Sequence, residues 1–72
     1  MKLKVDSKIT WVSAAGFLTG TIENIVLDYN AAGEIIPWIY IREQEIGSVS
    51  RLCATDSYLK IMKVKLVDPE LV

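Results

Sequence analysis

The chain has 72 residues, a formal net charge of −1, no histidine and a single cysteine. This length allows one small domain, and the charge gives no global field to hold nucleic acid. One cysteine without any histidine cannot make a structural zinc site, and the missing histidines remove the usual general base. Apolar residues make up 51% of the chain, so we expect one folded domain over residues 1–72 with some large apolar side chains left at the surface.

Cysteine use and the apolar runs indicate the compartment. The start, MKLKVDSKIT, is charged throughout, and the longest uncharged apolar run, residues 35–41, is far below the roughly 20 residues that span a bilayer. A small secreted domain normally carries several cysteines. We therefore expect a cytoplasmic protein without membrane contact, in which Cys53 packs as a small apolar residue.

Alternation with a period of two predicts strands along most of the chain. The predicted first strand covers residues 2–5, with its two lysines outward and Leu3 and Val5 inward. The β-favouring run ITWVS, residues 9–13, continues this strand across a bend. Glycines then bracket a predicted loop over residues 16–20.

The stretch TIENIVLDY, residues 21–29, predicts the next strand. Ile22 and Val26 share one face of it, and Ile25 lies on the other. Apolar residues on both faces indicate a bulge or strong coiling near Ile25, as at the corner of a barrel.

The stretch YNAAGE predicts a tight hairpin turn. Asn30 suits the first position of a type I turn and Gly33 its left-handed end, so residues 34–43 should run antiparallel to the preceding strand. Pro37 lacks an amide hydrogen, which places it at an edge, at a bulge, or facing solvent. Alternation puts Ile35, Ile39 and Ile41 in the core and Ile36, Trp38 and Tyr40 on the opposite face.

The last third of the chain predicts a polar turn over residues 42–47, a strand over 48–55, a helical turn over 55–60 and a final strand over 61–67. In the final strand, Met62, Val64 and Leu66 face inward. The predicted fold class is therefore all-β: a small, five-stranded, antiparallel barrel with one short helical turn before the last strand.

The run ITWVSAAGFLTGTIENI, residues 9–25, resembles Src-homology-3-like barrels of the KOW and Tudor kind. Gly20 matches the characteristic KOW glycine and Ile22 the apolar residue after it, and the turn DSYLK is similar to the helical turn before the last strand of such barrels. The resemblance implies a binding module. KOW domains bind nucleic acid or ribosomal and polymerase partners, and Tudor domains hold methylated lysine or arginine in an aromatic cage.

Aromatic residues supply the first candidate site. The strand after the hairpin turn offers Trp38 and Tyr40 outward, where proline leaves it partly unpaired, and aromatic residues are enriched at interfaces. We expect this face to meet a protein, self or foreign, and the alternative is that both residues pack in the core or in a dimer. The candidate members of the aromatic face, or of a cage, are Phe17, Tyr29, Trp38 and Tyr40.

Lysines supply the second candidate site. In Src-homology-3-like barrels the first and last strands are adjacent, which would align four outward lysines in a stripe for phosphates or an acidic partner. The simpler interpretation is that these lysines discourage edge-to-edge aggregation. The stripe consists of Lys2, Lys4, Lys63 and Lys65.

No pattern predicts catalysis. The chain has no phosphate-binding loop, dinucleotide fingerprint or serine-nucleophile elbow, and Glu43 and Glu45, two apart in a polar turn, should be solvated. We expect no enzyme, no cofactor, no metal and no small-molecule substrate. Three functions stay open: a protein–protein adaptor or accessory protein of the kind that phages and mobile elements encode, a nucleic-acid-binding barrel, or a structural homo-oligomer.

Overall fold

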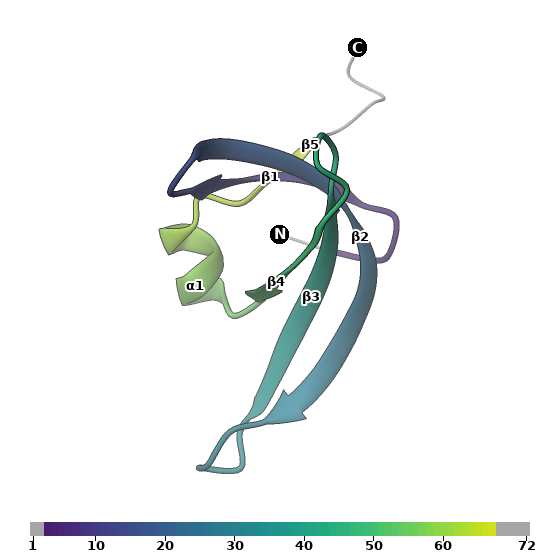
Figure 1. The fold of residues 1–72 in the computed structure, drawn as a ribbon. Coiled ribbons are helices and arrows are strands. Elements are labelled where there is room, and N and C mark those ends of the chain that lie inside the picture. The colour runs from purple at the N-terminus through teal and green to yellow at the C-terminus, as the bar shows by residue number, and fades with distance from the viewer. Residues whose placement is uncertain (1–2, 68–72) are drawn as a thin grey trace.

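The structure, a computed structural model, describes residues 3–67. Five antiparallel strands form one sheet in the order β4-β3-β2-β1-β5, and a short helix precedes the last strand (Figure 1). The predicted all-β architecture is confirmed. No ladder joins β4 to β5 within residues 3–67, so the curved sheet stays open. The elements are β1 (Lys8–Ser13), β2 (Gly16–Tyr29), β3 (Ile35–Glu43), β4 (Val49–Cys53), α1 (Asp56–Ile61) and β5 (Lys65–Val67).

The first strand lies further along the chain than predicted. Residues 3–4 have no regular structure, and residues 5–6 form a turn in which Asp6 has a φ of 77°. Ser7 closes this turn, because its N–H donates to the Lys4 carbonyl (3.0 Å) and its Oγ accepts from the Lys4 N–H (3.2 Å). A strand at the start of the chain is therefore wrong for the described residues, and β1 takes that role.

Gly20 allows a close contact between two backbones. β2 begins at Gly16 and the turn before it covers residues 14–15, so the loop predicted over residues 16–20 is wrong. A Cβ on Gly20 would lie 2.5 Å from the Arg42 carbonyl oxygen, a backbone atom that no rotamer change can move. The glycine therefore lets β2 approach β3 closely where the sheet coils.

β2 contains one extra residue relative to β3. Ile22 pairs with Ile41 and Asn24 pairs with Tyr40, so two steps along β2 match one step along β3 and Glu23 is left between them. The bulge that the sequence predicted in this strand is confirmed. Bulges bend a strand and increase its twist, which fits the strong curvature of β2 in Figure 1.

The bulge reverses the alternation of side chains along β2. Ile22 is fully buried and Ile25 packs against the same core, although they are three residues apart. Val26 turns to the opposite face and is 39% exposed. The prediction that Ile22 and Val26 share a face is wrong, because it counted alternation without the extra residue.

The predicted hairpin between β2 and β3 is confirmed. The Gly33 N–H donates to the Asn30 carbonyl at 3.0 Å, and Gly33 has a φ of 80°. The Asn30 Oδ1 accepts from the backbone N–H groups of Ala32 and Glu34, each at 2.9 Å. One side chain thus holds two amides of the reversal, as short polar residues do in turns.

Pro37 lies in an interior strand, since β3 has β2 on one side and β4 on the other. Its carbonyl accepts from the Ala54 N–H at 2.8 Å, one residue beyond the last β3–β4 pair, Trp38 with Cys53. The nitrogen and carbonyl of a strand residue point to the same side. The missing amide of Pro37 therefore faces the place where β4 has ended, and the β2–β3 ladder is unaffected.

The core lies between α1 and the face of the sheet that curves around it, which we call the inner face (Figure 1). Three residues predicted to point into the core are exposed instead: Val5 (45%), Ile35 (56%) and Leu66 (44%). Val5 lies in a turn, Ile35 lies on the hairpin beyond the core, and Leu66 lies on the edge strand β5. The buried apolar side chains are Ile9, Trp11, Ile22, Ile39, Ile41, Leu52, Leu59 and Val64.

α1 ends in a Schellman motif. The Val64 N–H donates to the Leu59 carbonyl at 3.0 Å, and the Lys63 N–H donates to the Lys60 carbonyl at 3.2 Å. Lys63 has a left-handed φ of 53°, at the position that glycine usually occupies. A side chain in this conformation costs roughly 1 kcal/mol. The motif turns the chain sharply from α1 into β5.

Candidate protein-interaction surface

The β2–β3 hairpin extends past the rest of the sheet as a two-stranded arm, residues 27–37. The last β4 residue in the ladder, Cys53, pairs with Trp38, and the Pro37 carbonyl accepts one further hydrogen bond from the Ala54 N–H. Beyond Pro37, the ladder within residues 3–67 joins the two strands of the arm only to each other. In Figure 1 its tip projects away from α1 and from β5. A two-stranded ribbon is only marginally stable by itself in water. The presence of this arm therefore calls for a structural or functional explanation.

The inner face of the arm carries an uncovered apolar strip, which we define as Leu27, Tyr29, Ile35 and Pro37. The cross-strand pairs Leu27 with Pro37 and Tyr29 with Ile35 continue the same face as the core pair Ile25 and Ile39. Leu27 is 65% exposed, Tyr29 68% and Ile35 56%. Contiguous exposed apolar side chains of this kind mark contact sites more often than scattered ones do.

The strip starts at an apolar hollow. Its volume is about 190 Å³, and it opens between the root of the arm and α1. Apolar side chains from the N-terminal segment, β2, β3 and α1 dominate its lining, with the carboxylate of Asp56 at the rim. The lining residues are Leu3, Ile25, Pro37, Ile39, Ala54, Asp56 and Leu59.

The outer face of the sheet carries the aromatic pair that the sequence singled out. Trp38 and Tyr40 alternate with the buried Ile39, so they point away from the core, and both are half-buried. The Arg51 guanidinium lies over the Trp38 ring, 4.1 Å from its centre. The aromatic pair is therefore less exposed than the inner strip.

The four candidate aromatic residues do not come together. Trp38 and Tyr40 lie on the outer face, and Tyr29 lies on the inner face at the tip of the arm. Phe17 lies beside the β1–β2 turn, opposite Val12, and is 65% exposed. This separation gives no basis for an aromatic cage.

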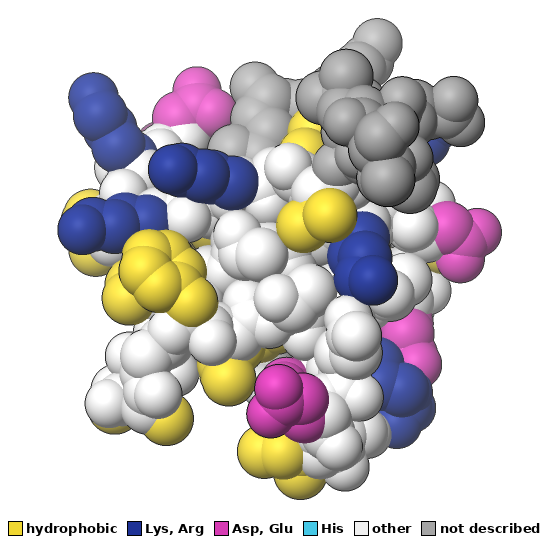
Figure 2. Space-filling model, turned by 90° about the horizontal axis from the view of Figure 1, so that it is seen from above, with side chains coloured by type: hydrophobic (Ala, Val, Ile, Leu, Met, Phe, Trp, Pro, Cys, Tyr) yellow, Lys and Arg dark blue, Asp and Glu magenta, His cyan; other side chains and the backbone are white. Residues whose placement is uncertain are grey.

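The described residues do not form the predicted stripe of four lysines. A group of three lysines, Lys60, Lys63 and Lys65, lines one hollow instead. Lys2 lies outside the described residues, and β5 pairs with residues 8–10 of β1, so no ladder aligns Lys4 with Lys63 and Lys65. Figure 2 shows basic side chains gathered on the left of the face seen from above, the side on which α1 lies in Figure 1. A hollow of about 350 Å³ is lined by Asp56, Leu59, Lys60, Lys63, Val64 and Lys65.

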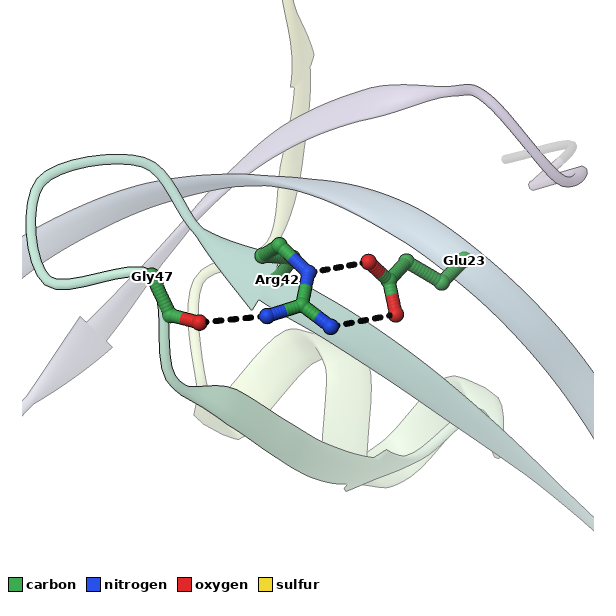
Figure 3. Close-up of polar contacts among 3 residues, drawn as sticks. All are labelled: Glu23, Arg42 and Gly47. Atoms are coloured by element: carbon green, nitrogen blue, oxygen red, sulfur yellow. Dashed lines mark hydrogen bonds and ion pairs between the residues drawn. The ribbon is translucent and has the colours of Figure 1, made fainter.

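Arg42 joins the bulge of β2 to the loop after β3 (Figure 3). Its Nε and Nη2 donate to the two carboxylate oxygens of Glu23, the latter at 3.2 Å, and its Nη1 donates to the Gly47 carbonyl at 2.6 Å. The hydrogen bond and the charge of Glu23 raise the pKa of Arg42. Because these contacts occupy all three nitrogens of its guanidinium, we interpret this cluster as a clasp that fixes the bulge.

A larger hollow lies beside this clasp and has a volume of about 520 Å³. Its charged lining consists of three acids, Asp6, Glu23 and Glu43, and two bases, Lys8 and Arg42. The formal charge of this lining is therefore only −1, and Arg42 is already paired with Glu23. Among residues 3–67, no three His, Cys, Asp or Glu side chains are grouped so that they could hold a metal.

Glu43 is buried, and the prediction that it is solvated is wrong. It is 4% exposed, and its Oε2 accepts a hydrogen bond from the Ile46 N–H. The alternation that points Ile39 and Ile41 inward also points Glu43 inward, and this signal was available in the sequence. Glu45 is exposed, as predicted.

No family model, curated protein or solved structure matches this chain. The sheet order, with β1 beside β5, is compatible with the Src-homology-3-like arrangement. No helix within residues 3–67 has the length and apolar content to cross a membrane. One member of the inner strip, Tyr29, was predicted from the sequence as a contact residue, but the strip as a surface was missed because Ile35 was assigned to the core and Leu27 was given no role.

Proposed function

We propose that this protein is a non-catalytic protein-binding module whose contact surface is the inner strip of the arm. The observation that carries the proposal is the exposure of Leu27, Tyr29 and Ile35 on one face, continuous with the core. Covering this strip would remove apolar side chains from water, which is the main favourable term in protein association. The adjoining apolar hollow gives a partner side chain a place to anchor.

The charge of the arm favours a protein over a nucleic acid. Residues 24–41 contain Asp28 and Glu34 and no lysine or arginine. Phosphate backbones are bound by basic side chains and repelled by carboxylates. The arm is therefore unsuited to nucleic acid and suited to an apolar surface with a basic rim.

A comparison of three variants in the source cells tests the proposal. Leu27→Ser with Ile35→Ser removes the strip, Trp38→Ala with Tyr40→Ala removes the outer aromatic pair, and Phe17→Ser removes an equally exposed apolar residue elsewhere. Affinity capture with quantitative mass spectrometry should show partners lost with the strip variant and kept with Phe17→Ser. Each candidate partner is then titrated as a purified protein.

Two results contradict the proposal. If the strip variant, shown by circular dichroism to be folded, binds every purified partner with unchanged affinity, the strip is not the contact surface. If the outer-face variant alone loses partners, the aromatic pair is the contact surface and the inner strip is not.

A second candidate function is nucleic-acid binding by the lysines around the α1–β5 hollow. Lys60, Lys63 and Lys65 line one hollow, which concentrates positive charge although the whole chain is slightly negative. Fluorescence anisotropy with labelled single- and double-stranded oligonucleotides tests it. Binding should weaken as salt rises, since phosphate contacts release counterions. A flat signal at low salt removes this function.

A further inference from the structure

We propose that the partner of the arm is a second copy of this chain, and that the arm docks on the α1–β5 surface of that copy. This inference rests on the proposed function, because it names the occupant of the same strip. The α1–β5 surface is defined by its lysines Lys60, Lys63 and Lys65 and by its exposed apolar residues Ile61, Leu66 and Val67.

The arm is apolar on its inner face and acidic at its tip. Glu34 lies in the hairpin turn and Asp28 lies on the outer face one pair before it, and both are exposed. Between residues 24 and 41 these two carboxylates are opposed by no basic side chain. The tip therefore presents apolar side chains beside two negative charges.

The α1–β5 surface has the opposite charge and a similar apolar content. Residues 56–67 contain three lysines and one acidic residue, Asp56, which lines the same hollow, so this surface keeps a formal charge of +2. Ile61 is 70% exposed, Leu66 44% and Val67 36%. The hollow among the lysines measures about 350 Å³ and has Leu59 and Val64 in its lining, a volume at the lower end of the range of ligand pockets.

The two surfaces complement each other in both respects. Apolar strip residues can enter the hollow between the lysines while Glu34, in the turn, meets their ammonium groups. Asp28, on the outer face, adds negative charge to the arm without facing the same surface. Complementary charge of this kind sets the orientation of two partners and disfavours others. Lys63 is held in the strained left-handed position at the rim of this hollow, and strain of this kind is concentrated at functional sites.

The arm and the α1–β5 surface lie in different parts of the molecule (Figure 1). Two copies can exchange arms about a two-fold axis, which gives a closed dimer. Alternatively, each copy can use its arm on one neighbour and its α1–β5 surface on another, which gives a ring or a filament. The chain should therefore form a dimer or a larger oligomer as the concentration rises.

Charge reversal tests the inference with the full chain. In one variant, Asp28→Lys with Glu34→Lys makes the arm basic; in the other, Lys60→Glu with Lys65→Glu makes the α1–β5 surface acidic. Within each variant the two surfaces then carry like charges. In an equimolar mixture, each arm again meets a surface of opposite charge. All samples are checked for folding by circular dichroism and studied by sedimentation velocity over a range of concentrations, before and after nuclease treatment.

The wild type should reach at least twice the monomer mass of 8.1 kDa, each variant alone should sediment as a monomer, and the mixture should regain the wild-type size. A wild type that stays monomeric overturns this inference and leaves the proposed function to the capture experiment. Variants that assemble as the wild type does also overturn it, because the contact then lies elsewhere. Assembly lost on nuclease treatment shows that nucleic acid joins the copies, which also contradicts the inference.

Discussion

The guanidinium of Arg51 lies 4.1 Å from the centre of the Trp38 ring, on the outer face of the sheet. In the β3–β4 ladder, Arg51 is opposite Tyr40 and Cys53 is opposite Trp38, so the cation reaches the indole diagonally across the strands. A cation at this distance is attracted by the electron-rich ring face and covers it. A side chain of β4 thus already covers part of the Trp38 ring, which the sequence analysis predicted to contact a partner.

Arg51→Ala should uncover Trp38 and destabilise the fold by about 0.5–1 kcal/mol, the usual strength of an exposed cation–π contact. Acrylamide quenching of tryptophan fluorescence measures the exposure. The signal reports mainly on Trp38, because Trp11 is 2% exposed. Arg51→Lys keeps a cation and should lose less stability. Unchanged quenching in Arg51→Ala would show that the contact does not form in solution.

Gly20→Ala should destabilise the protein by roughly 1–3 kcal/mol, the usual cost of forcing an extra carbon into a packed site. The added Cβ meets the Arg42 carbonyl oxygen at 2.5 Å and the Ile41 Cγ2 at 2.7 Å. Urea unfolding followed by circular dichroism gives the difference. Thr21→Ala, at the exposed neighbouring position, is the control and should change stability by less than about 0.5 kcal/mol.

Asn30→Ala should weaken the hairpin turn, since its Oδ1 accepts from two backbone amides. The expected loss is about 1 kcal/mol, and the arm amides should exchange hydrogen faster than those of β1. Hydrogen exchange read by mass spectrometry locates the effect. Asn30→Asp keeps the acceptor oxygen but replaces the Nδ2 group that donates to the Glu34 Oε1 at 3.2 Å. It should therefore lose less stability than Asn30→Ala without matching the wild type. Equal losses in both variants would mean that the carbonyl oxygen is not what holds the turn.

Lys63→Gly should raise the free energy of unfolding by about 0.5–1 kcal/mol, because glycine adopts a left-handed φ without the steric cost. Lys60→Gly removes the same charge from the body of α1 and should lower it by about 1 kcal/mol. Thermal and urea unfolding of the pair separate backbone strain from charge. If both variants move in the same direction, the strain at Lys63 is negligible.

Local rules predicted the parts of the fold that depend on neighbouring residues. The Asn30–Gly33 turn, the strands on either side of it, the helical turn before β5 and a bulge in β2 were all readable from residue type and alternation. Gly20 could not be read in this way. Whether Gly20 lies in a loop or leaves space for the Arg42 carbonyl depends on the position of β3, a strand whose contacting residue is more than 20 positions away in the sequence.

The candidate site was predicted less well, because exposure depends on where the core ends. Alternation gives Ile35 and Ile39 the same face. Ile39 is covered because the core between the sheet and α1 reaches it, and Ile35 is exposed because it lies beyond that core. The lysine stripe depended on which residues pair with β5. Once β1 begins at Lys8, the alignment of Lys4 with Lys65 is lost.

The bulge residue in β2 determines which of the side chains that follow it lie on the inner face of the sheet and which lie on the outer face. If Glu23 instead paired in the regular ladder, alternation would run uninterrupted from Ile22 to the hairpin, and the side chains of β2 beyond it would exchange faces. The Asp28 side chain would then lie on the inner face, where the Leu27 and Tyr29 side chains now lie. A carboxylate would replace apolar side chains there without any substitution. The bulge at Glu23, which is held by hydrogen bonds to Arg42, thus determines whether the inner face of the hairpin presents apolar or charged side chains to a neighbouring molecule.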